Sequence, residues 1–260
     1  MRLAIIGLGS IGRRRLRLLC EMGQTVMGYD ITSIQRSDGI AVAESPDELY
    51  AWKPEVIFIC TPPKSHVHLA LRALSVGIRG LFIEKPLSDS WNLAVKHLVA
   101  EAEAYDTVTM GAANWRFRAG VADLLAQPGP LVVRADVPIP KERRSNLLFD
   151  IGIHFLDLAL WTGHEIRWAL SYDAPYRIEM SCGAITLLWW DSSDGADDMY
   201  RAEMAHFLDC VEHGVPTCNP IDQAAETLRI LLDCVERGAP TGNPISQAAA
   251  ALRILLEAKI

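Results

Sequence analysis

A glycine-rich turn near the start of the chain has the spacing of a dinucleotide-binding loop. It follows the apolar run Leu3–Ile6 and opens the amphipathic stretch Ile11–Met22. Glycine permits a tight turn and lets the backbone approach a pyrophosphate, which then binds N–H groups at the start of a helix. A glycine-rich turn without a ligand is the alternative. We expect a nicotinamide dinucleotide to contact Gly7, Gly9, Ser10, Ile11 and Gly12.

An acidic residue after the next apolar run bears on which dinucleotide binds. Asp30 follows Thr25–Tyr29, roughly twenty residues beyond the glycines. A carboxylate there accepts hydrogen bonds from both ribose hydroxyls of NAD and repels the 2′-phosphate of NADP. Arg36 lies near enough in sequence to leave NADP open, and a plain turn residue is the alternative for Asp30. We expect NAD as the cofactor.

A loop after the apolar run Val56–Cys60 is placed to face the nicotinamide half of that cofactor. Ligands of open parallel sheets bind at the carboxyl ends of the strands. We therefore expect cofactor contacts from Thr61, Pro62 and His66, the alternative being a proline-fixed loop followed by a helix cap. His66 and His68 have no third ligand at a matching spacing, so we expect no metal.

A lysine stands at the end of the run Leu81–Ile83, in the sequence Glu84-Lys85-Pro86. An ammonium group at a strand's carboxyl end can hydrogen-bond a reacting hydroxyl and stabilise developing alkoxide charge. A solvated surface lysine is the alternative. We expect Lys85 to be catalytic and, with Glu84, to lie beside the cofactor.

Asp150 and His154 are four residues apart, so one face of a helix would present both side chains. A histidine titrates near neutral pH and can take a hydroxyl proton as hydride leaves. The alternatives are a helix cap for Asp150 and a buried core histidine for His154.

These motifs together resemble the Gfo/Idh/MocA oxidoreductases, a family that includes glucose–fructose oxidoreductase and inositol dehydrogenase. The resemblance rests on GLGSIG at 7–12, TPPxxH at 61–66, EKP at 84–86, NWRF at 114–117 and DxGxHxxDL at 150–158. It covers the first 160 residues well and the tail only loosely. The resemblance implies that Lys85, Asp150 and His154 are catalytic and that Asn114 and Arg116 line the substrate site.

Two departures from the family pattern concern the site. Many relatives carry a histidine in the first helix where this chain has Arg15, a change expected to affect packing more than chemistry. The basic cluster at residues 141–144 includes Arg144, which we expect to clamp a carboxylate or phosphate of the substrate. A solvated loop is the alternative for this cluster.

The elements that must position these residues indicate two domains. Strand-length runs alternate with helical patterns over residues 1–115, which predicts a Rossmann-type, doubly wound parallel sheet. Clustered strands over residues 116–260 predict a small α+β domain with a reduced, mainly antiparallel open sheet and a helical tail. The predicted strands are Leu3–Ile6, Thr25–Tyr29, Val56–Cys60, Leu81–Ile83, Thr107–Gly111, Leu131–Val137, Ile166–Ser171, Arg177–Ser181 and Ala184–Trp190, and the second domain's helices are Gly120–Ala126 and Asp150–Trp161.

The tail contains a tandem repeat, because residues 207–230 and 231–254 are identical at 17 of 24 aligned positions. Two copies are too few for a solenoid, so we expect a role in packing or oligomerisation. The apolar run Leu187–Trp190 shows no alternation and predicts a strand covered on both faces. A partner's sheet would supply that cover, hence a homo-oligomer, dimer or tetramer, through the C-terminal sheet.

Composition excludes several function classes. The 260 residues carry a formal net charge of −7, which argues against a nucleic-acid partner. No apolar stretch reaches the length of a membrane span. Six cysteines without a CxxC pair are typical of reduced thiols, so we expect a cytoplasmic location.

The sequence as a whole predicts an NAD(P)-dependent oxidoreductase. Hydride would pass between nicotinamide and a secondary alcohol or ketone carbon of a sugar, cyclitol or related polar metabolite, with an acidic group that suits the basic cluster. The alternatives are an imine or ketone reductase of a biosynthetic pathway and a non-catalytic NAD-binding sensor or assembly subunit.

Overall fold

The computed structural model describes residues 1–32, 41–137, 148–171, 175–189 and 195–236. Two compact units divide the chain, and each is described by itself. The first contains Met1–Ala112 together with Tyr200–Ala225, and the second contains Ala113–Met199 and the residues from Glu226 on. The predicted boundary between the two domains lies near residue 115, whereas residues 200–225 group with the first unit.

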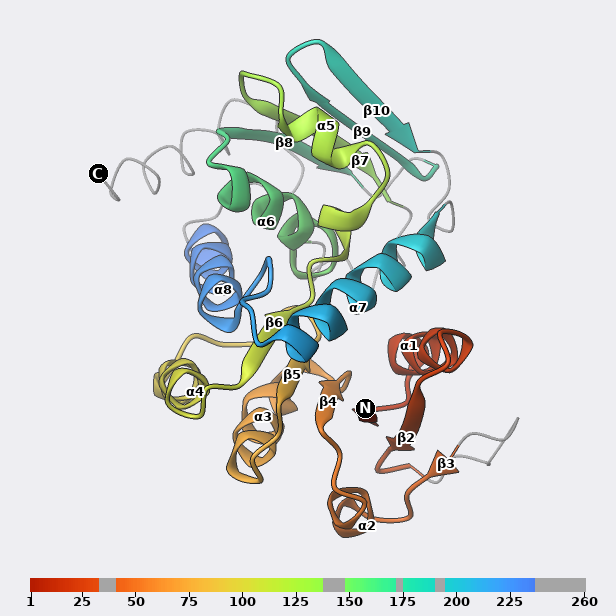
Figure 1. Ribbon diagram of the computed structural model, residues 1–260. Helices are drawn as coiled ribbons and strands as arrows, with labels where there is room; N and C mark the ends of the chain where they lie inside the picture. Colours follow the sequence, from red (N-terminus) through yellow and green to blue (C-terminus); the bar gives the residue numbers. More distant parts are fainter. Residues whose placement is uncertain (33–40, 138–147, 172–174, 190–194, 237–260) are drawn as a thin grey trace. The chain divides into compact units, whose positions relative to one another are not determined.

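The first unit is built on a six-stranded parallel sheet with the order β3-β2-β1-β4-β5-β6 (Figure 1). This is the predicted Rossmann-like arrangement. Parallel strands place their carboxyl ends at one edge, so the loops after β1, β2, β4 and β5 share that edge. The strands are β1 Arg2–Ile6, β2 Thr25–Tyr29, β3 Ala41–Val42, β4 Val56–Ile59, β5 Gly80–Ile83 and β6 Val108–Gly111.

Helices cover this sheet, and every residue of β4 and β5 is buried. Continuous burial without alternation is expected where both faces of a parallel strand are covered. Phe207 packs edge-on against Phe58 of β4 and Phe82 of β5, with ring centroids 5.5 and 5.4 Å apart. The helices are α1 Ser10–Glu21, α2 Pro46–Ala51, α3 His66–Ser75, α4 Leu93–Ala104 and α7 Ala196–His213, which carries Phe207.

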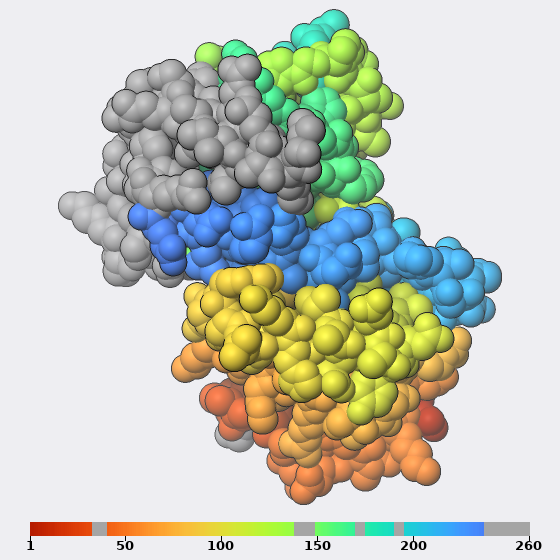
Figure 2. Space-filling view, turned by 90° about the vertical axis from the view of Figure 1, so that its left-hand side faces the viewer, coloured from red at the N-terminus to blue at the C-terminus, as the bar shows by residue number. Residues whose placement is uncertain are grey.

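The turn between α7 and α8 (Ile221–Glu236) completes the edge of this sheet at β6. Gly111 and Asn219 exchange two hydrogen bonds of 2.9 Å, and the Thr217 hydroxyl donates to the Thr109 carbonyl at 2.7 Å. The first copy of the repeat therefore packs on the sheet, as expected of a packing role. A cavity of about 440 Å³ lies between α4 and this turn, where the yellow and blue surfaces meet in Figure 2. It borders the start of β6, the end of the strand opposite to the glycine turn.

The second unit contains a mixed four-stranded sheet with the order β10-β9-β7-β8. β7 pairs with β8 in parallel and with β9 antiparallel, and β9 pairs with β10 antiparallel. The small, mainly antiparallel sheet is thus confirmed. The strands are β7 Leu131–Asp136, β8 Ile166–Ser171, β9 Arg177–Cys182 and β10 Ile185–Trp189, and the helices are α5 Val121–Leu125 and α6 Ile153–Thr162.

Side-chain burial alternates along β10 within the single chain, although its sequence does not alternate. Leu188 is 41% exposed, whereas Trp189 is buried. Cover of Leu188 by a partner's sheet stays a prediction, and Trp190 and most of the second repeat copy lie outside the described residues. Among the described helices, none is both long and apolar enough to cross a bilayer.

Candidate cofactor and active site

The glycine turn after β1 has the shape that a pyrophosphate site requires. Gly7 adopts a φ of +95°, where L side chains are strained, and its N–H donates to the Tyr29 carbonyl at 2.8 Å. A Cβ on Gly7 would lie 2.7 Å from the Thr61 nitrogen, and one on Gly12 would overlap the Gly7 carbonyl. A Cβ on Gly9 would meet nothing within 4 Å. Two glycines therefore allow close packing, and the third leaves room for a ligand.

The first turn of α1 offers backbone donors to an anion. Gly9 is the N-cap and supplies no side-chain hydrogen bond, and the first turn contains no acidic residue. Uncapped N–H groups and the positive end of the helix dipole favour a phosphate there. Ser10 is exposed and Ile11 is half-buried, so both border this space. The residues present fit the pyrophosphate of a dinucleotide.

Asp30 lies at the end of β2, directly beside the glycine turn. Its Oδ2 accepts the Leu8 N–H at 2.7 Å, and its Oδ1 accepts the Thr32 N–H at 2.9 Å and the Thr32 hydroxyl at 2.8 Å. Partial burial raises the pKa of Asp30, but the donors from Thr32 and Leu8 outweigh it and hold the pKa below its ordinary value. The lowered pKa favours the ionised carboxylate, and contact of Asp30 with a cofactor ribose stays a prediction.

Replacing Asp30 by alanine is expected to weaken NAD⁺ binding by about tenfold and to reduce the preference for NAD⁺ over NADP⁺. The ribose loses its acceptor, and a 2′-phosphate no longer meets a carboxylate. Fluorescence titration with NADH and NADPH measures both effects. Thr32→Val is the control, because it removes only the hydroxyl donor to Asp30. An unchanged preference in the alanine variant would remove Asp30 from the ribose site.

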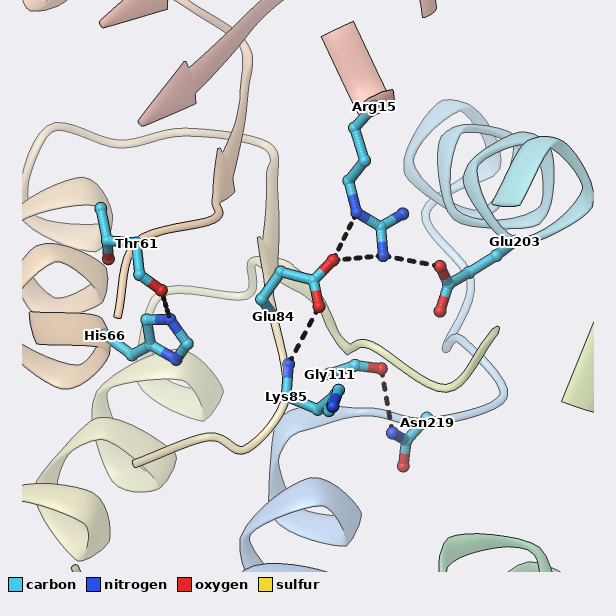
Figure 3. Close-up of polar contacts among 8 residues, drawn as sticks. All are labelled: Arg15, Thr61, His66, Glu84, Lys85, Gly111, Glu203 and Asn219. Carbon is cyan, nitrogen blue, oxygen red and sulfur yellow. Dashed lines mark hydrogen bonds and ion pairs between the residues drawn. The ribbon is translucent and has the colours of Figure 1, made fainter. Parts of the chain in front are cut away.

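His66 connects the loops that follow β4 and β5 (Figure 3). The ring is fully buried, with Nε2 2.6 Å from the Thr61 carbonyl and Nδ1 2.9 Å from the Pro86 carbonyl. Burial lowers the pKa of His66, and the two carbonyls oppose that shift. His66 thus holds the backbone on both sides of the site. Its contact with a cofactor, like those of Thr61 and Pro62, stays a prediction.

Lys85 follows β5 at the same edge of the sheet and is half-buried. Its N–H donates to Oε2 of Glu84 at 3.3 Å. Glu84 is buried, and its Oε1 lies 2.6 Å from Nε of Arg15. The expectation that Arg15 affects packing more than chemistry stays a prediction, but its guanidinium does contact the acidic residue of the EKP motif. Sequence reasoning missed this pairing, since 69 residues separate the two.

The second unit holds Asp150 and His154 at the start of one helix. Asp150 lies in a π-helical turn, Leu148–Gly152, that leads directly into α6. Wide turns of this kind occur often at functional sites. Gly152 is the N-cap of α6, so Asp150 is not the cap residue. His154 is 9% exposed.

The His154 ring lies beside Trp115, which belongs to an aromatic cluster within this unit. The Trp115 ring lies 6.0 Å from it and packs edge-on against Phe155 and Trp189 at 5.3 and 5.5 Å. Arg118 lies 4.8 Å from the Trp115 ring and 4.7 Å from the Trp189 ring. Trp115 belongs to the NWRF motif, whereas no motif in the sequence predicts that Trp189 packs against it. Trp115 therefore links the His154 ring to Phe155 and Trp189.

Arg116, predicted to bind substrate, is instead engaged with Asp157 of α6. Its Nε and Nη2 contact the two carboxylate oxygens at 2.8 and 2.7 Å. Burial raises the pKa of Asp157, while the guanidinium lowers it. Asn114 is buried on the same segment. The NWRF segment is therefore anchored to the His154 helix, and substrate contact by Asn114 or Arg116 stays a prediction, as does that of Arg144, outside the described residues.

Removing one partner of the Arg116–Asp157 pair is expected to destabilise the protein strongly. Asp157→Ala leaves a buried guanidinium without its carboxylate, which costs about 3–5 kcal/mol of unfolding free energy. The double variant with Arg116→Met should recover part of that loss. Urea denaturation of the single and double variants measures both. Additive losses in the double variant would show that the pair is not coupled.

Comparison with known proteins identifies the first unit. Residues 1–112 match the family GFO_IDH_MocA, described as "Oxidoreductase family, NAD-binding Rossmann fold". Oxidoreductase P35 of Formosa agariphila is 27% identical over 135 residues, which make up 48% of this chain and 39% of that protein. The match therefore spans well under half of that relative's length.

Solved structures share the fold across nearly the whole chain. The myo-inositol 2-dehydrogenase from Lactobacillus plantarum has a TM-score of 0.76 at 14% identity, covering 92% of this chain and 97% of its own. The UDP-N-acetylglucosamine 3-dehydrogenase from Acidithiobacillus ferrooxidans has a TM-score of 0.75 at 18% identity, covering 89% and 95%. An Agrobacterium radiobacter oxidoreductase crystallised with NAD⁺, L-tartaric acid and magnesium has a TM-score of 0.71 at 15% identity, covering 92% and 96%.

The family match, the shape of the glycine turn and the shared fold agree with one another. Residues 1–112 form an NAD-binding Rossmann domain, which confirms the predicted cofactor. Residues 1–112 match the model of the Gfo/Idh/MocA oxidoreductases, the family that the motifs of this chain resemble.

Proposed function

We propose that this protein is an NAD-dependent dehydrogenase that oxidises a secondary alcohol, or reduces the matching ketone, of a sugar, cyclitol or related polyhydroxylated metabolite. The Rossmann domain of an oxidoreductase family supports the redox class. Neighbours of the same fold named as inositol and amino-sugar dehydrogenases support the substrate class. The family motifs at Lys85, Asp150 and His154 support turnover over mere cofactor binding, because a binder needs none of the three.

In the proposed reaction, Lys85 donates a hydrogen bond to the substrate oxygen and stabilises the negative charge that develops there. His154 takes the hydroxyl proton as general base, and Asp150 orients the groups around it. Bound NAD⁺ supplies the hydride acceptor. The C–H hydrogen leaves with its electron pair, the O–H proton goes to the base, and a carbonyl remains.

The observation that carries the proposal most is the placement of Lys85. It follows a buried parallel strand at the carboxyl edge of the sheet, where ligands of such sheets bind. The backbone on each side of it is held in place, by Glu84 before it and by the His66 contact with the Pro86 carbonyl after it. A lysine with only a solvated surface role needs neither support.

The test is NADH formation from NAD⁺ with a panel that contains myo-inositol, UDP-N-acetylglucosamine and L-tartrate. We expect NADH with at least one polyhydroxylated compound and a loss of that activity in His154→Ala. Tight NAD⁺ binding without NADH from any member of a broad sugar panel would favour a non-catalytic NAD-binding protein instead.

The proposal also includes the oligomeric state and the cellular location of the protein. We infer a homo-oligomer through the C-terminal sheet, because Leu188 on the edge strand β10 is exposed in the single chain. Light scattering of the purified protein tests this inference. All six cysteines are free thiols, which fits a reducing compartment such as the cytoplasm.

A further inference from the structure

Arg15 is a fully buried cation at the carboxyl edge of the Rossmann sheet. It lies on α1, one turn after the glycine loop. Its Nη2 lies 2.6 Å from Oε1 of Glu84 and 2.8 Å from Oε2 of Glu203 on α7 (Figure 3). Both glutamates are buried, and Glu203 is 0% exposed. One guanidinium therefore joins three elements that are far apart in the sequence.

Two aromatic rings also fix the guanidinium. Its Cζ lies 4.4 Å from the Phe82 ring centroid and 4.9 Å from that of Tyr200. Burial would lower the pKa of Arg15, but the carboxylates of Glu84 and Glu203 outweigh it and raise that pKa. Arg15 is thus permanently charged, and its planar fork has a defined orientation.

A contribution to stability does not by itself explain why these charged residues are buried together. Taking charges out of water is expensive, and well-packed apolar residues often replace a buried ion pair without loss of stability. The contacts of Glu84 suggest another use. Its Oε1 binds Arg15, whereas its Oε2 accepts the N–H of Lys85 at 3.3 Å. Glu84 therefore contacts both the arginine and the backbone of the lysine.

We propose that Arg15 is a positioning residue that acts through Glu84 to hold Lys85 in its working orientation, while Glu203 contacts the same Nη2 atom of the guanidinium from α7. This inference rests on the proposed function, since it gives Lys85 its task. It assigns a role in chemistry to α1 beyond phosphate binding.

The chain offers a matched pair of variants. Glu84→Gln and Glu203→Gln each neutralise one buried carboxylate that contacts Arg15, and Glu84 is the one that accepts the Lys85 backbone N–H. General destabilisation would affect both variants alike. Arg15→Met keeps much of the side-chain volume without the charge, and Arg15→Lys keeps the charge without the fork. Thermal denaturation identifies the variants that fold.

The readout is the rate at which trace acetic anhydride labels Lys85 in the full-length protein, measured by mass spectrometry. Exposed Lys64 and Lys96 provide internal references. We expect Glu84→Gln and Arg15→Met to change the relative labelling of Lys85 by about threefold or more, and Arg15→Lys to restore part of it. Glu203→Gln should change it clearly less than Glu84→Gln.

Equal effects of the two glutamine variants, or unchanged Lys85 labelling in folded Arg15→Met, would overturn the proposal. If Arg15→Met does not fold, the comparison of Lys85 labelling in Glu84→Gln and Glu203→Gln tests the proposal instead. The labelling needs neither substrate nor turnover, so a lack of dehydrogenase activity would contradict the proposed function and leave this test intact. Where turnover is measurable, kcat of Arg15→Met should fall by about tenfold or more, with a smaller change in the KM for NAD⁺.

Discussion

Lys85→Ala is expected to lower turnover by roughly 100- to 1,000-fold, the effect of removing one donor to a developing oxyanion. The loss should appear in kcat, because the hydrogen bond to the substrate oxygen strengthens as negative charge develops. Steady-state kinetics with the best substrate of the panel, together with NADH titration, separate this loss from one of cofactor affinity.

Lys64→Ala is the control for Lys85→Ala, because it removes an exposed lysine from the neighbouring loop after β4. Its turnover should match that of the wild type. Intact turnover in Lys85→Ala would show the proposed mechanism to be wrong, whatever happens to NAD⁺ affinity.

Two alanine variants of the glycine turn are expected to lose different properties. Gly12→Ala should lose stability, and Gly9→Ala should lose affinity for NAD⁺. In Gly12→Ala, the added methyl group overlaps the Gly7 carbonyl, so the turn or the helix must shift. We expect a loss of about 3 kcal/mol of unfolding free energy, the upper range for overpacking. In Gly9→Ala, the methyl group meets no protein atom, so stability should change by less than about 0.5 kcal/mol.

The affinity for NAD⁺ shows whether Gly9→Ala, although stable, changes the cofactor site. A methyl group at Gly9 occupies the space through which the pyrophosphate approaches the backbone, so affinity should fall by about tenfold or more. Chemical denaturation and NADH titration of both variants measure the two effects. Normal affinity in Gly9→Ala would place the phosphates elsewhere.

The fold was largely predictable because its signals are local. Buried runs such as Val56–Ile59 and the glycine turn each carry their own pattern within a few residues. Strand β3 was missed because it has only two residues, Ala41–Val42, and its pairing with β2 rather than its sequence defines it. Helix α2 was missed as well, although Ser45 caps it through a hydrogen bond to the Glu48 N–H.

The partners within the site were less predictable because they are distant in the sequence. Arg15 and Glu203 lie 188 positions apart, and neither lies in a motif that predicts contact with the other. Arg116 is predicted to bind substrate, but its motif gives no sign that Asp157 contacts both Nε and Nη2 of its guanidinium. The motifs therefore predicted the reacting groups, whereas the contacts of Arg15 and Arg116 became visible only in the folded chain.

Transfer of deuterium tests the central claim most directly. An alcohol from the panel, labelled with deuterium at the reacting carbon, is incubated with NAD⁺ and the full-length protein, and the nicotinamide product is analysed by mass spectrometry. The account predicts deuterated NADH from the wild type and almost none from Lys85→Ala that still binds NAD⁺. NADH without deuterium, or equal transfer by both proteins, would contradict it.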